Sequence, residues 1–243
     1  MTAPILKVEG LTAGYQPGLP IIRDVTMHVT TGELVTIIGP NGAGKSTLIK
    51  AVAGLLHVEG GKVELAGSDI TRIDTHRMAD AALAYVPQTD NIFASLTVDE
   101  NLRLGAQALS KATARERVEE AYQKFPDLRR FAKKKAGVLS GGQRQMLAVG
   151  RALLTHPEIV MLDEPSAGLS PKMVDDVFAQ LVALRAAGVS ILMVEQNAKA
   201  AMRISDRTYV LAEGENRLDG PSAALLEDPE VTQIYLGRAG RKQ

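Results

Sequence analysis

Nine consecutive residues near the start of the chain combine glycines, a lysine and hydroxyl side chains in one short stretch. They are Gly39, Pro40, Asn41, Gly42, Ala43, Gly44, Lys45, Ser46 and Thr47. Glycines let the backbone turn tightly and direct its N–H groups at an anion. In loops of this spacing the lysine neutralises the terminal phosphates and the serine hydroxyl is a magnesium ligand. The stretch therefore predicts a loop that binds the phosphates of a nucleotide.

The residues on either side supply the context that this motif requires. The apolar run at 34–38 predicts a strand, and the pattern from about 45 to 53 is typical of a helix. A helix that starts at the loop adds the positive end of its dipole to the phosphate site. Both flanking elements together argue against a chance glycine-rich turn.

A pair of acidic residues follows a second apolar run. Residues 159–162 are all apolar and are followed by Asp163 and Glu164. The pattern predicts a buried strand whose carboxyl end meets a ligand, as in open α/β sheets. We expect Asp163 to hold magnesium, directly or through water, and Glu164 to accept a proton from an attacking water. Without the phosphate loop, an acidic strand end with no chemistry would be the simpler interpretation.

A third motif, LSGGQ at 139–143, precedes a helical pattern at 142–154. In this order and spacing the three motifs resemble those of the ATP-binding subunits of ABC transporters, over essentially the whole chain. The resemblance implies ATP and Mg2+ at the site, and two subunits that face each other head to tail. The signature loop of one subunit would then close on the γ-phosphate held by the other, because a serine hydroxyl, glycine N–H groups and a helix start suit an anion. Its residues are Ser140, Gly141, Gly142 and Gln143.

Other positions resemble functional residues of the same family. Tyr15 resembles the aromatic residue that stacks on adenine, with an ordinary turn tyrosine as the alternative. Gln88 resembles the glutamine that contacts magnesium or water and couples to the membrane partner. With Ser46 and Asp163 it completes the metal site that the resemblance implies. Residues 166–170, SAGLS, correspond to the D-loop, with a serine at the last position where the family usually has aspartate.

One position departs from the family pattern. After the predicted strand at 189–194, Gln196 stands where the family usually has a switch histidine. A glutamine amide can donate a hydrogen bond to the γ-phosphate, but it carries no charge and shuttles no proton. Glu164 is therefore the general-base candidate, and the catalytic set that we expect is Glu164, Lys45 and Gln196.

Finer features resemble the ATPases of branched-chain amino acid importers. They are VEQN at 194–197, LTVDENL at 96–102, and an ending from DPEV to IYLG at 228–237. The resemblance implies a homo- or heterodimer with another ATPase subunit, integral membrane permease subunits and, indirectly, a periplasmic solute-binding protein. Urea and short-amide importer ATPases look similar, including the glutamine at the switch, whereas the lipopolysaccharide-export ATPase shares the ending but has histidine there.

Two other classes of function remain as alternatives. A soluble ABC-type ATPase that acts on DNA or ribosomes usually has coiled-coil insertions or two fused halves, which this chain lacks. A kinase with a phosphate loop would leave the signature loop without a role. Membrane partners therefore give the leading hypothesis, an ATP-driven dimer closure coupled to permease subunits.

The composition bounds where the protein works. The 243 residues contain 28 Lys and Arg and 28 Asp and Glu, so no global field favours nucleic acid, and there is no cysteine. The basic cluster within 129–135 is interpreted as a solvated helix end, not as a nucleic-acid site. There is no signal-peptide pattern at the start and no apolar run of about 20 residues. We therefore expect a cytoplasmic protein, peripheral on the cytoplasmic face of the inner membrane.

The elements must position these motifs. Strands are predicted at 5–11, 25–29, 34–38, 62–66 and 83–86, helices at 98–109, 114–125 and 172–187, and alternating strands and helices over 159–210. We expect one ABC ATPase domain, 1–243, with a strand-rich region (residues 1–87), a helical subdomain (88–155) and the rest of the core with C-terminal helices (156–243). The fold class is α/β, an ABC-type phosphate-loop NTPase with a mostly parallel core sheet, an N-terminal antiparallel β subdomain and a helical subdomain.

Overall fold

The computed structural model describes residues 3–74, 77 and 82–236. The strands are β1 (Pro4–Gly14), β2 (Ile22–Thr30), β3 (Leu34–Ile38), β4 (His57–Leu65), β5 (Ser68–Asp69), β6 (Leu83–Val86), β7 (Ile159–Asp163), β8 (Ser190–Val194), β9 (Arg207–Ala212) and β10 (Glu215–Pro221). The helices are α1 (Lys45–Val52), α2 (Val98–Gly105), α3 (Lys111–Lys124), α4 (Pro126–Arg130), the 3-10 helix η2 (Ala136–Val138), α5 (Gly141–Leu153), α6 (Pro171–Ala186), α7 (Ala198–Ile204), α8 (Ser222–Leu226) and α9 (Pro229–Leu236).

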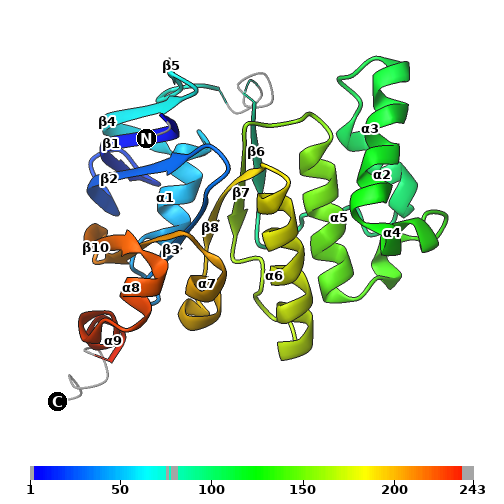
Figure 1. The fold of residues 1–243 in the computed structure, drawn as a ribbon. Coiled ribbons are helices and arrows are strands. Elements are labelled where there is room, and N and C mark those ends of the chain that lie inside the picture. Colours follow the sequence, from blue (N-terminus) through cyan, green and yellow to red (C-terminus); the bar gives the residue numbers. More distant parts are fainter. Residues whose placement is uncertain (1–2, 75–76, 78–81, 237–243) are drawn as a thin grey trace.

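The strands form two sheets of different character (Figure 1). One is antiparallel, in the order β2-β1-β4-β5. The other has the order β10-β9-β3-β8-β7-β6, with β10 antiparallel to β9 and the neighbouring pairs from β9 to β6 all parallel. Strands β3, β7 and β8 are buried along their whole length, as expected of parallel strands covered on both faces. The predicted fold class is confirmed.

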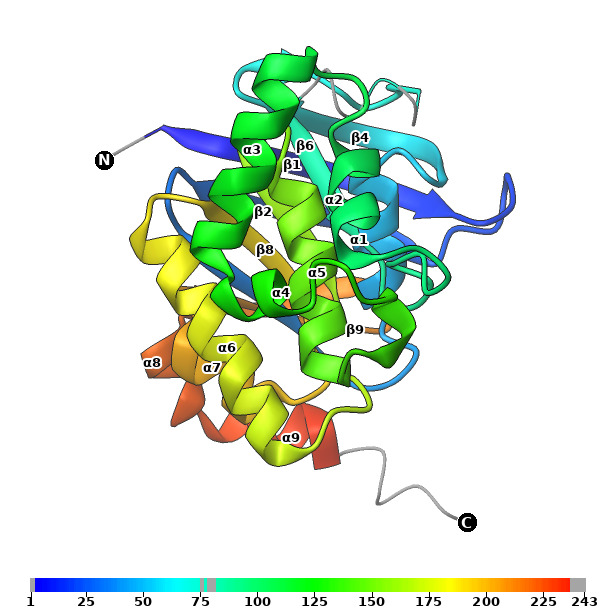
Figure 2. The same ribbon diagram turned by 90° about the vertical axis from the view of Figure 1, so that its right-hand side faces the viewer.

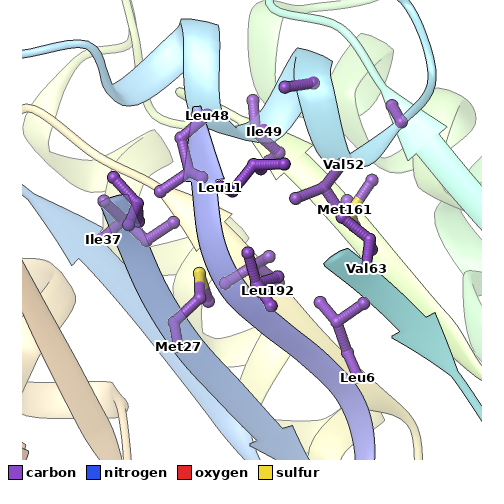
Figure 3. Packing of buried hydrophobic residues seen from close by; sticks show 14 of the residues in the cluster. Leu6, Leu11, Met27, Ile37, Leu48, Ile49, Val52, Val63, Met161 and Leu192 are labelled. Atoms are coloured by element: carbon purple, nitrogen blue, oxygen red, sulfur yellow. The ribbon is translucent and has the colours of Figure 1, made fainter. Parts of the chain in front are cut away.

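Helix α1 lies between the two sheets and joins them into one core (Figure 3). Its Leu48, Ile49 and Val52 are buried in the same cluster as Leu6 and Leu11 of β1. The parallel strands also contribute to this cluster from one of their faces. The helix that follows the phosphate loop is thus held on both sides by apolar packing.

The opposite face of the parallel sheet is covered by helices. Met161 and Leu192 face the cluster around α1, whereas their neighbours Leu162 and Met193 pack with α2, α5 and α6. This alternation follows from the two-residue period of a strand. Figure 2 shows helices α2 to α6 in front of the sheet. Within the described portion of the chain, no helix combines the length and the apolar character that a bilayer crossing requires.

Some predicted elements have different bounds in the structure. The helix predicted at 98–109 is wrong beyond Gly105, because the chain turns there and Ser110 caps a new helix by accepting a hydrogen bond from the Thr113 N–H. Strand β4 begins at His57, five residues before the predicted 62–66. Strands β3 and β6 lie in the parallel sheet although both belong to the strand-rich region at 1–87. The three-way division of the domain therefore stays a prediction.

The first two residues of the basic cluster within 129–135 end a short helix, α4, whose bounds the sequence analysis did not predict. Arg129 forms an ion pair with Glu119 and lies over the ring of Tyr122, 4.8 Å from its centroid. Arg130 pairs with Asp127 at 3.3 Å. Two of the five cations thus have acidic partners within the helical region, as expected of a solvated helix end.

Candidate nucleotide-binding and hydrolysis site

The phosphate loop, the acidic pair and Gln196 lie where strands end at one edge of the parallel sheet. In the register, Ile37 of β3 and Asp163 of β7 both pair with Val194, the last residue of β8. The Glu164 N–H donates to the Val194 carbonyl at 2.9 Å, and the Glu195 N–H donates to the Ile37 carbonyl at 3.0 Å. The loops after β3, β7 and β8 therefore leave the sheet side by side, where open α/β sheets bind ligands.

The loop between β3 and α1 is too tightly packed for side chains at its ends. A β-carbon on Gly39 would lie 2.1 Å from the Leu211 carbonyl oxygen of β9. One on Gly44 would lie 2.8 Å from a methyl of Ile22, and the φ of Gly44 is 96°. Glycine is the residue that fits both constraints, so the backbone can follow the tight turn that the motif predicts.

Lys45, the first residue of α1, is 5% exposed. Its Nζ donates to the carbonyl oxygens of Gly39 at 2.8 Å and Pro40 at 3.3 Å, so the side chain folds over the loop. Burial lowers the pKa of Lys45, and the nearby carboxylates of Glu164 and Asp163 oppose part of that shift. An ammonium held in this way is placed to neutralise phosphate oxygens.

Asp163 is 3% exposed and receives two hydrogen bonds. The Ser46 hydroxyl donates to its Oδ1 at 3.0 Å, and the Tyr85 hydroxyl donates to its Oδ2 at 3.2 Å. Burial and the adjacent Asp163 carboxylate raise the pKa of Tyr85, which therefore stays a donor. The carboxylate is fixed on both of its oxygens.

This donor set suits Mg2+ that is shared with phosphate. Among the described residues, no cluster of three or more His, Cys, Asp or Glu side chains could by itself hold a metal ion. Mg2+ is commonly held by one or two carboxylates together with substrate phosphates and water. The Asp163 carboxylate fits that pattern, because it is hydrogen-bonded to the Ser46 hydroxyl beside the phosphate loop.

Glu164 occupies a strained position next to Asp163. Its φ is 47°, in the left-handed region that residues with a side chain rarely adopt. Gln88, on the loop after β6, donates from Nε2 to Glu164 Oε2 at 2.9 Å. Strain of this kind persists where the surroundings over-determine the backbone, and it is common at functional sites.

Gln196 faces the phosphate loop from the end of β8. Its Nε2 donates to the Asn41 side-chain oxygen at 3.1 Å, and the residue is exposed. The amide donor that the sequence predicted is thus directed at the loop that would hold the phosphates.

The signature loop and Tyr15 lie on other elements. Ser140 caps α5 in a capping box, in which its hydroxyl accepts from the Gln143 N–H and the Gln143 side chain accepts from the Ser140 N–H. Gly141 and Gly142 form the first turn of α5, where N–H groups have no acceptor within the helix. Tyr15 follows β1 and is 55% exposed.

Two residues of the site were missed by the sequence analysis. Tyr85 contacts Asp163, and Glu195 is a buried carboxylate directly after β8. A signal for Glu195 was present, because an acidic residue follows the apolar run at 191–194 there, as Asp163 follows the apolar run of β7. The signal for Tyr85 was weak, since tyrosine is common in strands.

The chain is similar in sequence to known proteins of one family. The family model described as ABC transporter matches residues 22–167. The chain is 42% identical to a probable branched-chain amino acid transport ATP-binding protein LivF of Archaeoglobus fulgidus, covering 96% of this chain and 99% of the relative. It is 38% identical to the high-affinity branched-chain amino acid transport ATP-binding protein BraG of Pseudomonas aeruginosa, covering 92% and 96%. A lipopolysaccharide export system ATP-binding protein LptB of Haemophilus influenzae is 32% identical, covering 96% and 97%.

Solved structures share the fold. The ADP conformation of MJ1267, an ATP-binding cassette of an ABC transporter, matches with a TM-score of 0.86 and 31% identity, covering 97% of this chain and 100% of that one. The dimeric structure of MJ0796, a bacterial ABC transporter cassette, matches with a TM-score of 0.76 and 26% identity, covering 89% and 98%. The chain therefore belongs to the ABC transporter family, as one of its ATP-hydrolysing, ATP-binding subunits.

Proposed function

We propose that this chain is the motor subunit of an importer for branched-chain amino acids. The observation that supports the proposal most strongly is the identity of 42% and 38% to LivF and BraG proteins over nearly the whole chain. The LptB relative, named for lipopolysaccharide export, is less similar at 32%. A urea or short-amide importer is the alternative that the Gln196 switch leaves open.

In the proposed reaction, the phosphate loop holds ATP and Lys45 neutralises its terminal phosphates. Glu164 takes a proton from the attacking water, and Gln88 orients the Glu164 carboxylate through the 2.9 Å hydrogen bond. Gln196 donates to the γ-phosphate as a neutral group, and Tyr15 stacks on the adenine ring.

Ser46 and Asp163 would hold Mg2+, because their oxygens lie together beside the phosphate loop. When bound, the metal neutralises charge on the phosphate oxygens during transfer. Gln88 remains a proposed contact of that metal or of its water.

The signature residues would act on ATP held by a second subunit. The dimeric structure of the MJ0796 cassette supports a two-subunit arrangement, and the N-terminal end of α5 offers N–H groups to an anion. ATP binding would close the dimer and hydrolysis reopen it, with the movement passed to membrane permeases that receive solute from a binding protein. In this arrangement the subunit lies on the cytoplasmic face of the membrane.

Uptake in cells tests the proposed solute. We expect cells that lack the gene to lose most uptake of labelled leucine, isoleucine and valine. The wild-type gene should restore it. Glu164→Gln should not, because the amide cannot act as a base and hydrolysis falls by on the order of 10²–10⁴-fold. Immunoblots should show equal amounts of both proteins.

The same strains separate the alternatives. Normal leucine uptake with loss of urea or short-amide uptake would replace the proposed solute. Normal uptake of all of these with a defect in lipopolysaccharide export would reject the importer.

A further inference from the structure

One buried carboxylate next to the site, Glu195, has no role in the proposed reaction. Glu195 is 1% exposed and directly precedes Gln196. Burial raises its pKa, and hydrogen bonds to the carboxylate oppose part of the shift. A carboxyl group is costly to bury unless it is hydrogen-bonded, so its partners show what it holds in place.

Two hydrogen bonds to Glu195 come from one residue of another loop. Its Oε1 accepts from the Ser166 N–H at 2.9 Å, and its Oε2 accepts from the Ser166 hydroxyl at 2.8 Å. Oε2 also accepts from the Gln196 N–H at 3.1 Å. Ser166 is itself buried. The carboxylate therefore accepts hydrogen bonds from both the backbone and the side chain of Ser166.

Ser166 lies in the turn that begins at the proposed general base. The Ala167 N–H donates to the Glu164 carbonyl at 3.1 Å, which closes the turn around Ser166. The Glu164 end of the turn is tied to β8, because the Glu164 N–H donates to the Val194 carbonyl. Glu164 itself has the strained φ of 47°.

A strained backbone conformation relaxes unless neighbouring groups hold it. The contacts that hold this turn on its far side are those from Glu195 to Ser166. Without them, the turn can relax and carry the Glu164 carboxylate away from Gln88 and the phosphate loop.

We propose that Glu195 is a positioning residue for hydrolysis, which holds Glu164 in place through Ser166. The hydrogen bonds of its carboxylate run to Ser166 and to the start of its own loop, so it acts on the rate of the chemical step more than on nucleotide binding. The inference rests on the proposed role of Glu164 as general base.

The test compares Ser166→Ala and Glu195→Gln with wild-type protein. Ser166→Ala removes one hydrogen bond and leaves the backbone contact. Glu195→Gln replaces one carboxylate oxygen, an acceptor, by an amide NH2 group, a donor. Either the Ser166 N–H or the Gln196 N–H then faces a donor and loses its acceptor. We expect kcat for ATP to fall about 10-fold in Ser166→Ala and further in Glu195→Gln, which corresponds to hydrogen bonds with a charged partner. In Ser166→Ala, ATP affinity measured by calorimetry should stay within about 2-fold, because the substitution leaves the loop from Gly39 to Thr47 and its contact with Gln196 in place.

A second background distinguishes positioning from general destabilisation. In Glu164→Gln, the base is absent, so adding Ser166→Ala should leave the residual single-turnover rate within about 2-fold. Glu227→Gln, an exposed glutamate far along the chain after α8, is the matched control and should keep wild-type kcat. Hydrogen exchange of the Ser166 amide should accelerate in Glu195→Gln if the hydrogen bond from the Ser166 N–H is lost.

Three results would overturn the inference. One is a kcat of Ser166→Ala within about 2-fold of wild type. Another is a parallel loss of ATP affinity. The third is the same loss of rate in the Glu164→Gln background. If Glu195→Gln fails to fold, the kcat and ATP affinity of Ser166→Ala alone decide whether the inference holds. A wild-type rate in Glu164→Gln itself would instead reject the base assignment on which the inference rests.

Discussion

The side chain of Gln196 can donate a hydrogen bond but cannot take up or release a proton at physiological pH. Its amide nitrogen donates to the Asn41 side-chain oxygen at 3.1 Å, so it already points at the phosphate loop as a donor. An amide has no pKa in the physiological range, unlike the imidazole that the family usually has at this position. In the proposed reaction the Gln196 amide therefore donates to a phosphate oxygen, and Glu164 is the proposed base.

The pH profile of ATP hydrolysis tests this role. We expect Gln196→His to introduce an acid limb between about pH 6 and 7.5, because the imidazole gains charge in that range, whereas wild type lacks this limb. Gln196→Ala should lower kcat by about 10- to 100-fold, as for one hydrogen bond to a charged group, and thus less than Glu164→Gln does. If Gln196→Ala abolishes turnover as completely as Glu164→Gln, then Gln196 also positions the attacking water.

At the scale of elements, the loop from β3 to α1 depends on a neighbouring strand. Gly39 lies against the backbone of β9, where a β-carbon would be 2.1 Å from the Leu211 carbonyl oxygen. Backbone cannot move aside as a flexible side chain can. The shape of the phosphate loop is therefore imposed by a strand that begins about 170 residues later in the chain.

Gly39→Ala tests this dependence. We expect it to lower the free energy of unfolding by about 1–3 kcal/mol through overpacking, and to reduce ATPase activity on the order of 10²-fold because the loop is displaced. Gly67→Ala is the control, since Gly67 has a φ of 78° and a β-carbon there would meet nothing within 4 Å. It should cost about 1 kcal/mol in urea denaturation and leave ATPase activity unchanged. Equal losses of activity in both variants would contradict the steric explanation.

At the scale of the whole molecule, the two loops that we propose to bind phosphate lie in different regions of the fold. The phosphate loop precedes α1, between the two sheets, whereas the signature loop precedes α5, on the helical face (Figures 1 and 2). A composite site in a head-to-tail dimer would take one end from each subunit.

Mixing two inactive variants tests the composite site. Lys45→Ala removes the ammonium from one side, and Ser140→Arg fills the signature loop from the other. Alone, each variant should have little ATPase activity, because both sites of its dimer carry one lesion. A mixed dimer has both lesions in one site and leaves the other intact, so random mixing should restore up to about a quarter of the wild-type sites. No recovery, with mixed dimers demonstrated by cross-linking, would count against shared sites.

Some of the fold follows from local patterns. The strands at 34–38 and 83–86 have the predicted bounds, and α6 begins at Pro171, one residue before the predicted start. Strand β10 and helix α4 were missed, because charged and turn-forming residues in ENRLDGP and PDLRR hide the hydrophobic period. Such edge and connecting elements are stabilised by neighbours that a local pattern does not include.

The sequence by itself determined the class of chemistry, because the phosphate loop, the acidic strand end and the signature loop each depend on residue types at short spacing. Only the tertiary structure decided which groups meet across the chain. It brought Ser46 to Asp163, Gln88 to Glu164 and Glu195 to Ser166. The physical reason is that parallel strands end at a common edge in an order, β3-β8-β7-β6, that is not the order of the chain. Buried polar groups at that edge must find partners there, whatever their distance in sequence.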